Sequence, residues 1–64
     1  MHVLLLKKGA RGNITTWIQL RCGANPDGIF GTDTENAVKW MQRKWNINDD
    51  GIVGQNTWSK LLGL

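Results

Sequence analysis

Disulfide-forming cysteine is missing from this 64-residue chain, because its single cysteine, Cys22, has no partner within the chain. A chain of this length buries only about 60% of the surface that its unfolded form exposes. A fold of this size without a disulfide therefore depends on close packing of a small core. We therefore expect one domain over residues 1–64, with no room for a catalytic domain beside a recognition domain. Residues 1–5 are expected to be a frayed end or an expression remnant, and Met1 and His2 are either native or added.

Long hydrophobic runs are also missing. The longest apolar run, Val3–Leu6, is too short to span a bilayer, and Lys7 and Lys8 end it. It is a poor signal peptide, because the positive charges follow the apolar stretch and no cleavage pattern is present. We therefore expect a soluble chain whose export comes from sequence outside it or from a lysis-type route.

Signatures of catalysis are missing as well. The only histidine is His2, and no phosphate-binding loop, nucleophile elbow or metal-spaced cluster occurs. The spacing of Asn46, Asn48 and Asp50 imitates the start of a calcium loop like those of dockerins, but Thr57 stands where a bidentate glutamate is needed. The sequence therefore predicts a chain that is not an enzyme, with no cofactor and no metal site.

The chain is basic, with a formal net charge of +3 and no acidic residue before Asp27. Such a surface suits an anionic polymer, whether nucleic acid, teichoic acid or a glycan that carries carboxylates, and it also suits a merely solvated helix face. Nucleic-acid binding would rest on this charge alone, because no recognition-helix pattern accompanies it. We expect a monomer that binds neither nucleic acid nor membrane.

An internal repeat organises the sequence. Sliding the chain on itself by 23 residues gives eight identities over the 21 positions from Ile14 to Thr34. The identical pairs are Trp17/Trp40, Gln19/Gln42, Asn25/Asn48, Asp27/Asp50, Gly28/Gly51, Ile29/Ile52, Gly31/Gly54 and Thr34/Thr57. Each unit has the pattern of a helix, a tight Asp-Gly loop and the entry into another helix. Two units end to end therefore predict three helices joined by two similar loops.

Local signals predict where the helices begin and end. Asn13 is the expected N-cap of the first helix, and Gly23 is expected in the left-handed conformation after its end. Thr32 and Glu35 have the spacing of a capping box at the start of the second helix. Asn46, which tolerates positive φ, is expected to end it.

Apolar spacing predicts the core of an all-α, compact three-helix bundle. The second helix is expected to turn four residues inward, namely Ala37, Val38, Met41 and Trp45. A short third helix should start near 55–57 and run through Trp58, Leu61 and Leu62. Ile29 and Ile52 are expected to plug the core from the two Asp-Gly-x-x-Gly loops, where glycines supply the positive φ that the turns need.

These motifs resemble the peptidoglycan-binding-like domains over about residues 6–62. Residues 6–12 look like the opening Leu-x-x-Gly-x-x-Gly of that family, and residues 27–34 look like its Asp-Gly-x-Phe-Gly-x-x-Thr. Residues 37–42 resemble its Ala-Val-x-x-Phe-Gln, and residues 50–58 resemble its closing Asp-Gly-x-x-Gly-x-x-Thr-Trp. Each piece alone is a weak signal, but the combination is specific.

The resemblance implies a non-catalytic module that holds an attached enzyme on the bacterial cell wall. The enzymes attached to such modules are wall hydrolases such as amidases and muramidases, often phage endolysins, and the partner is bacterial peptidoglycan, through its glycan strand or its stem peptide. An alternative is a helical module that binds another protein, as in the pro-regions of secreted zinc proteases. The inhibitory cysteine segment of those pro-regions is not visible around Cys22.

Candidate binding residues follow from this resemblance and from their chemistry. Trp17 and Trp40 stand where the family is usually polar, which favours the surface, with partial burial as the alternative for Trp40. Trp40 and Arg43, one turn apart, form the leading pair, because an indole covers sugar C–H faces and a guanidinium binds carboxylates bidentately. Secondary candidates are Asp27, Phe30, Arg11 and Trp17.

Other polar and aromatic residues have structural interpretations. Gln19 and Gln42 are expected to hydrogen-bond to the loops, and Asp27 and Asp50 to accept amides within their own turns. Cys22 is expected to be buried. The expected core also includes Trp45 and Trp58.

Overall fold

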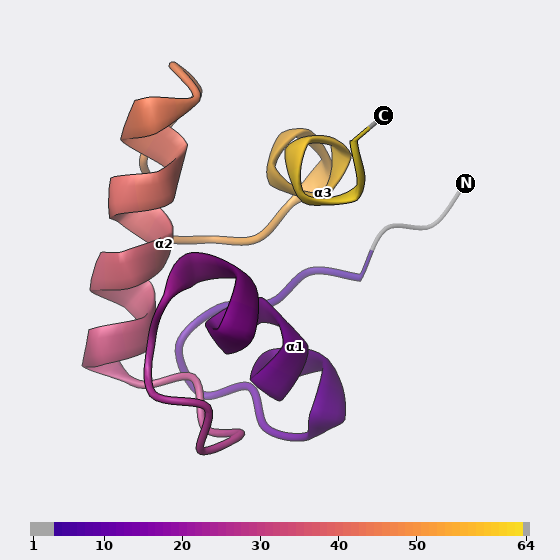
Figure 1. Ribbon diagram of the computed structural model, residues 1–64, viewed down its shortest axis with the longest axis vertical. Coiled ribbons are helices and arrows are strands. Elements are labelled where there is room, and N and C mark those ends of the chain that lie inside the picture. The colour runs from indigo at the N-terminus through magenta and orange to yellow at the C-terminus, as the bar shows by residue number, and fades with distance from the viewer. Residues whose placement is uncertain (1–3, 64) are drawn as a thin grey trace.

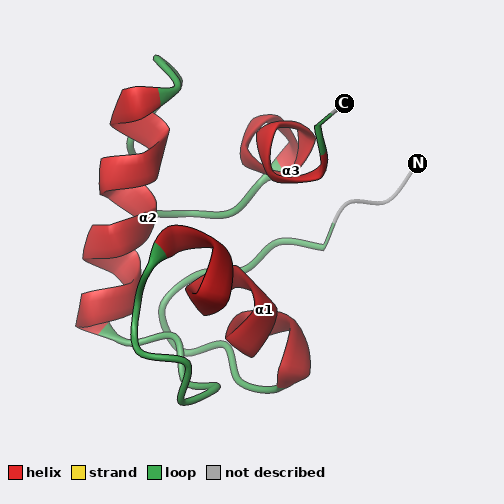
Figure 2. Ribbon diagram, viewed as in Figure 1, coloured by secondary structure: helices red, strands yellow, loops and turns green. Residues whose placement is uncertain are grey.

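Three helices make up the regular structure in the computed structural model, which describes residues 4–63: α1 (Asn13–Cys22), α2 (Thr32–Lys44) and α3 (Gln55–Leu62). The long helix α2 lies along one side of the molecule, and α1 and α3 lie beside it (Figure 1). Loops join them, and the described residues contain two isolated β-bridges but no strand (Figure 2). The predicted all-α three-helix fold is confirmed. None of these helices is long and apolar enough to cross a membrane.

Each helix begins immediately after a glycine rather than at a side-chain cap. The N-cap residues are Gly12, Gly31 and Gly54, and their carbonyls accept the first helical hydrogen bonds. The predicted caps Asn13 and Thr32 are wrong, because both residues already lie inside their helices. From there a side chain is past the position that bonds the free amides of the first turn.

The helix ends agree with the sequence. Gly23 follows α1 with φ of 81°, and Asn46 follows α2 with φ of 56°. Asn46 is the one residue other than glycine with positive φ in the described chain. These left-handed residues turn the chain out of each helix without the steric cost that most side chains would incur.

The core lies between the three helices and the two loops. Val38 and Met41 of α2 are buried as predicted, and Ala37, Trp45 and Trp58 are partly buried against the core. Cys22 is buried and free. The buried hydrophobic residues are Leu6, Ile18, Cys22, Phe30, Val38, Met41, Val53 and Leu61.

The loop residues that plug the core are Phe30 and Val53, which are 1% and 0% exposed. The predicted plugs, Ile29 and Ile52, are wrong, because Ile29 is 45% exposed and Ile52 lies outside the core. Neighbouring side chains of extended backbone point to opposite sides, so only one of each pair can face inward. The backbone of Phe30 bonds to Gly9 and Ala10, and that of Val53 bonds to Leu6.

The N-terminal segment, residues 4–12, pairs with both loops. Leu6 exchanges two backbone hydrogen bonds with Val53, at 3.2 and 2.7 Å. Further along, residues 9–12 bond to residues 28–30 of the first loop. The indole of Trp58 donates to the carbonyl of Leu4. Met1 and His2 lie outside the described residues.

Candidate ligand-binding surface

The first loop is organised around the fully buried side chain of Gln19. Its Nε2 lies 2.8 Å from Asp27 Oδ1 and 3.0 Å from both the Ile29 carbonyl and Thr34 Oγ1. Its Oε1 accepts the Gly28 amide at 2.9 Å. One –NH₂ group has two hydrogens, so the three contacts of Nε2 share them. The predicted structural role of Gln19 is confirmed, since this one side chain joins α1, the loop and α2.

The second loop repeats this arrangement 23 residues later around Gln42. Its Nε2 lies 3.2 Å from Asp50 Oδ1 and 3.0 Å from both the Ile52 carbonyl and Thr57 Oγ1. Its Oε1 accepts the Gly51 amide at 3.0 Å. Every partner is the counterpart of a partner of Gln19. The repeated residues therefore make the same hydrogen bonds in both loops.

The two loop aspartates accept backbone amides within their turns, as predicted. Asp27 Oδ1 and Asp50 Oδ1 each lie 2.9 Å from the amide nitrogen two residues on, that of Ile29 or Ile52. The Ile29 amide, together with the amide of Gln19, lowers the pKa of Asp27 below its ordinary value. The Oδ1 atoms of Asp27 and Asp50 therefore already accept hydrogen bonds within the fold.

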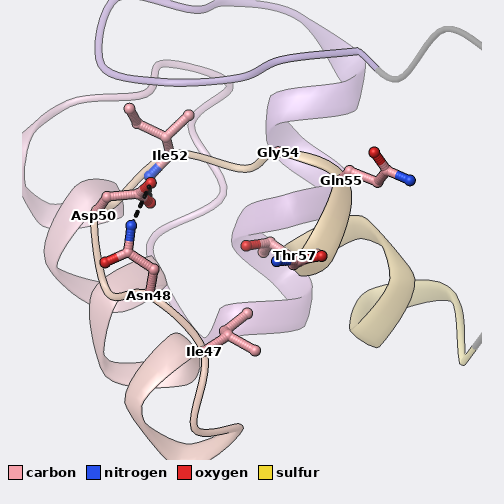
Figure 3. A pocket seen from close by; sticks show the side chains of 8 residues that line it. Ile47, Asn48, Asp50, Ile52, Gly54, Gln55 and Thr57 are labelled. Atoms are coloured by element: carbon pink, nitrogen blue, oxygen red, sulfur yellow. Dashed lines mark hydrogen bonds between the residues drawn. The ribbon is translucent and has the colours of Figure 1, made fainter.

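A small pocket opens beside each loop. The pocket of the second loop has a volume of about 280 Å³ and lies between residues 47–52 and the start of α3. Figure 3 shows Asn48 and Asp50 on one wall, Thr57 on the other and Ile47 below. The pocket of the first loop, of about 200 Å³, has its lining positions related to those of the second by the 23-residue shift. Sequence reasoning missed both pockets, although the repeat was the signal that could have paired them.

The leading pair, Trp40 and Arg43, lies on the exposed side of α2. Trp40 is 55% exposed, and the Nζ of Lys44 lies over its ring, 4.6 Å from the centroid. Arg43 instead bonds Asp49, with Nε 2.8 Å from Oδ2. This contact lowers the pKa of Asp49. Lys44 was missed, although its spacing of four residues from Trp40 could have indicated it.

Trp17 lies on a different face, at the edge of an apolar hollow. Its ring stacks on that of Trp58 with centroids 5.9 Å apart and planes inclined by 17°. The guanidinium carbon of Arg21 lies 5.2 Å from the Trp17 centroid. The hollow has a volume of about 390 Å³, and Ile14 and Leu62 complete its apolar lining. Trp17 is 36% exposed, so part of its ring is open to solvent.

The six candidate binding residues do not converge on one cleft. Phe30 is 1% exposed and fills the core, so its prediction as a ligand contact is wrong. Asp27 lines the first loop pocket, whereas Trp40 and Arg43 line none of the three hollows described above. Arg11 is exposed beside the first loop, where its backbone pairs with Ile29.

Metal-binding and nucleophilic groups are the remaining features of the described residues. Among residues 4–63, no three histidine, cysteine or carboxylate side chains lie close enough together to hold a metal ion. Burial raises the pKa of the Cys22 thiol, which keeps it protonated and a poor nucleophile. The surface instead presents exposed indoles, cations and pockets lined by amides.

The chain is similar to several solved structures of known proteins. No curated protein matches it at a significant level. Among solved structures, a peptidoglycan-binding protein from Clostridioides difficile, in complex with glutamine hydroxamate, has a TM-score of 0.85 and 33% identity, over 91% of this chain and 40% of that one. The SleB N-terminal domain has a TM-score of 0.89 and 26% identity, over 98% of this chain and 94% of that one. A Burkholderia AP3 phage endolysin has a TM-score of 0.86 and 32% identity, over 91% of this chain and 24% of that one.

The chain thus spans less than half the length of two of these three proteins. Residues 13–61, which include all of α2 and both loops, match the family described as "Putative peptidoglycan binding domain". That match agrees with the expected motifs and with the observed fold. The chain belongs to the family of peptidoglycan-binding domains.

Proposed function

We propose that this chain is a non-catalytic module that binds peptidoglycan and holds an attached wall-lytic or wall-remodelling enzyme at the bacterial cell wall. The observation that carries this proposal is the family match over residues 13–61. One of the similar structures is an endolysin about four times as long as the matched region, since the match covers 24% of it. A tethered weak binder raises the local concentration of its enzyme on an insoluble substrate. The module acts as a monomer.

The exposed side of α2 is the surface that we propose for glycan contact. Trp40 presents an exposed ring, and Lys44 holds a positive charge over that ring. The Arg43–Asp49 pair is exposed on both sides, so it contributes little stability and can exchange Asp49 for a ligand carboxylate. The three side chains together offer a stacking face for sugars and two cations for stem-peptide carboxylates.

Retention on purified peptidoglycan tests the function. The isolated chain is expected to sediment with insoluble peptidoglycan at low and moderate salt. Failure to sediment under both conditions would refute the proposal. Trp40→Ala and Arg43→Ala should each reduce the retained fraction, by about fivefold for loss of one good contact. Leu20→Ala is the control, because Leu20 is exposed on α1 and lines none of the three hollows.

A second candidate function, binding of another protein, has one observation in its favour. The hollow formed by Ile14, Trp17, Trp58 and Leu62 is apolar, which suits a protein surface better than a sugar polymer. Ile14→Ser tests the choice, because Ile14 is 47% exposed and outside the core. Unchanged retention of Ile14→Ser on peptidoglycan would show that another surface binds the wall. Loss of retention would show that the hollow itself binds peptidoglycan.

A further inference from the structure

The two loop pockets share a construction that suits one kind of ligand group. We propose that they are paired subsites for secondary amides that carry a small alkyl group, an inference that rests on the proposed function. Peptidoglycan offers this group twice, in the acetamido substituents of its sugars and in its stem peptide. Five of the lining positions carry the same residue in both pockets: Asn25/Asn48, Asp27/Asp50, Ile29/Ile52, Gly31/Gly54 and Thr34/Thr57.

The chemistry of the second pocket matches such a group. Asn48 and Asn56 are among its lining residues, and so are Ile47 and Ile52. A carboxamide both donates and accepts, so it can pair with the N–H and the C=O of a secondary amide. The isoleucine side chains then contact the alkyl group, as in small-molecule sites that combine apolar walls with a few placed polar groups.

The walls are held in place before any ligand arrives. Gln42 fixes Asp50, the Ile52 carbonyl and Thr57 by hydrogen bonds, and these three residues form opposite walls of the pocket (Figure 3). Asn48 donates to Asp50 Oδ2 at 3.4 Å and keeps its own carbonyl oxygen for a ligand. Asn56 makes no side-chain hydrogen bond within the described residues. A preformed site of this kind spends little conformational entropy on binding.

Besides Ile47, which lines only the second pocket, the lining differs at Gln55/Thr32 and at Asn56/Asp33, and only the latter changes the charge. Asn56 of the second pocket is replaced by Asp33 in the first, and Asp33 is exposed. An ionised carboxylate only accepts hydrogen bonds, so it cannot donate to the carbonyl of an amide ligand. The first pocket is also smaller, at about 200 Å³ against about 280 Å³. The second pocket is therefore the tighter subsite.

Exchange of these two residues gives a reciprocal test. The probe is an N-acetylglucosamine oligosaccharide, titrated while backbone amide shifts of the isolated chain are recorded. Shifts are expected in residues 47–57 at lower concentration and in residues 25–34 at higher concentration. Asn56→Asp should weaken binding at the second loop by about tenfold, and Asp33→Asn should strengthen it at the first. Both positions lie in the first turn of a helix, so neither exchange removes a core contact.

Matched ligands and a matched variant complete the design. The same oligosaccharide after N-deacetylation should cause no loop shifts, and a stem-peptide fragment without sugar shows whether peptide amides also enter the pockets. Asn36→Ala is the control variant, because Asn36 is an exposed asparagine that lines neither pocket. Loop shifts with the acetylated sugar or with the peptide fragment support the proposal and identify the source.

Three results would overturn the inference while leaving the proposed function intact. The first is retention on peptidoglycan with shifts confined to Trp40 and its neighbours. The second is equal response to acetylated and deacetylated sugar, and the third is unchanged binding of Asn56→Asp. Shifts at one loop only would overturn the pairing of the subsites. If the unsubstituted chain were not retained on peptidoglycan at all, the proposed function itself would be refuted.

Discussion

At the scale of single residues, buried polar groups decide much of this small fold. Gln19 and Gln42 are fully buried, and each hydrogen-bonds to four partners across a loop. Thr15 contrasts with them, because it is 1% exposed and its Oγ1 has no hydrogen-bond partner. A buried polar atom costs free energy unless it is paired. Two glutamines therefore stabilise the fold, and one threonine weakens it.

Thr15→Val is expected to stabilise the protein. The exchange keeps the shape and replaces an unpaired hydroxyl by a methyl group, which should raise the free energy of unfolding by about 1 kcal/mol. For a domain of this size that corresponds to a Tm increase of roughly 4–8 °C, measurable by circular dichroism. Thr16→Val is the control, because Thr16 Oγ1 bonds the Gly12 carbonyl at 3.3 Å. A lower Tm for Thr15→Val would show that its hydroxyl has a partner in solution.

At the scale of elements, the loops are held by glycines in the left-handed region. Gly51 has φ of 75°, and a Cβ there would lie 2.8 Å from Glu35 Cγ and 3.1 Å from Lys39 Cε. Gly23, with φ of 81°, has no atom within 4 Å of the same position. Gly23→Ala should therefore cost only the backbone strain, about 1 kcal/mol, and Gly51→Ala about 2–3 kcal/mol. Urea unfolding of both variants tests this order, and equal losses would contradict the crowding around Gly51.

The acid stability of the first loop follows from Asp27. Its pKa is lowered in the folded state, so the unfolded chain takes up a proton first as the pH falls. The contribution of Asp27 is fully present above about pH 4, its unfolded pKa, and is lost as the pH falls through the lower folded pKa. Asp27→Asn should therefore flatten the fall of Tm below about pH 4. Asp33→Asn, which makes the same charge change outside these hydrogen bonds, is the control, and an equal effect would contradict the assignment.

The elements that the sequence predicted correctly are those with local signals. The repeat and its left-handed residues, Gly23 and Asn46, gave the number and the ends of the helices. The N-caps lie one residue earlier than predicted, because glycine also serves as an N-cap and stands directly before the polar residue in both helices. The inward choice of Phe30 over Ile29 depends on pairing with the N-terminal segment, a contact distant in sequence. Local patterns cannot show it.

The candidate site was predictable to a smaller degree. Exposure of Trp17 and Trp40 agrees with the sequence, because both indoles stand beside an inward-facing apolar residue. The pairing of Arg43 with Asp49 rather than with Trp40 was not predictable, since the turn after α2 brings the aspartate within reach. The pockets arise between a loop and the next helix, so only the fold reveals them.

At the scale of the whole molecule, the N-terminal segment links the two loops by non-covalent contacts, in a chain that has no disulfide. It pairs with both loops, at Val53 and at residues 28–30, and it buries Leu6 in the common core. One segment thus ties together two repeats that would otherwise meet mainly through side chains. The segment lies outside residues 13–61, the part that matches the family. Its contribution to folding can therefore be measured apart from the matched region.

Leu6→Ala and removal of residues 1–12 test this role in two steps. Leu6 is 7% exposed, so Leu6→Ala should lower the free energy of unfolding by about 2–4 kcal/mol, whereas Leu5→Ala, at a site 58% exposed, should cost under about 1 kcal/mol. Small domains have only about 5 kcal/mol in total. The chain that starts at Asn13 also loses the backbone bonds to both loops, so it should show no cooperative thermal transition and no retention on peptidoglycan. A cooperative transition in that shortened chain would contradict the role of the segment, because the helices and loops would then close the core by themselves.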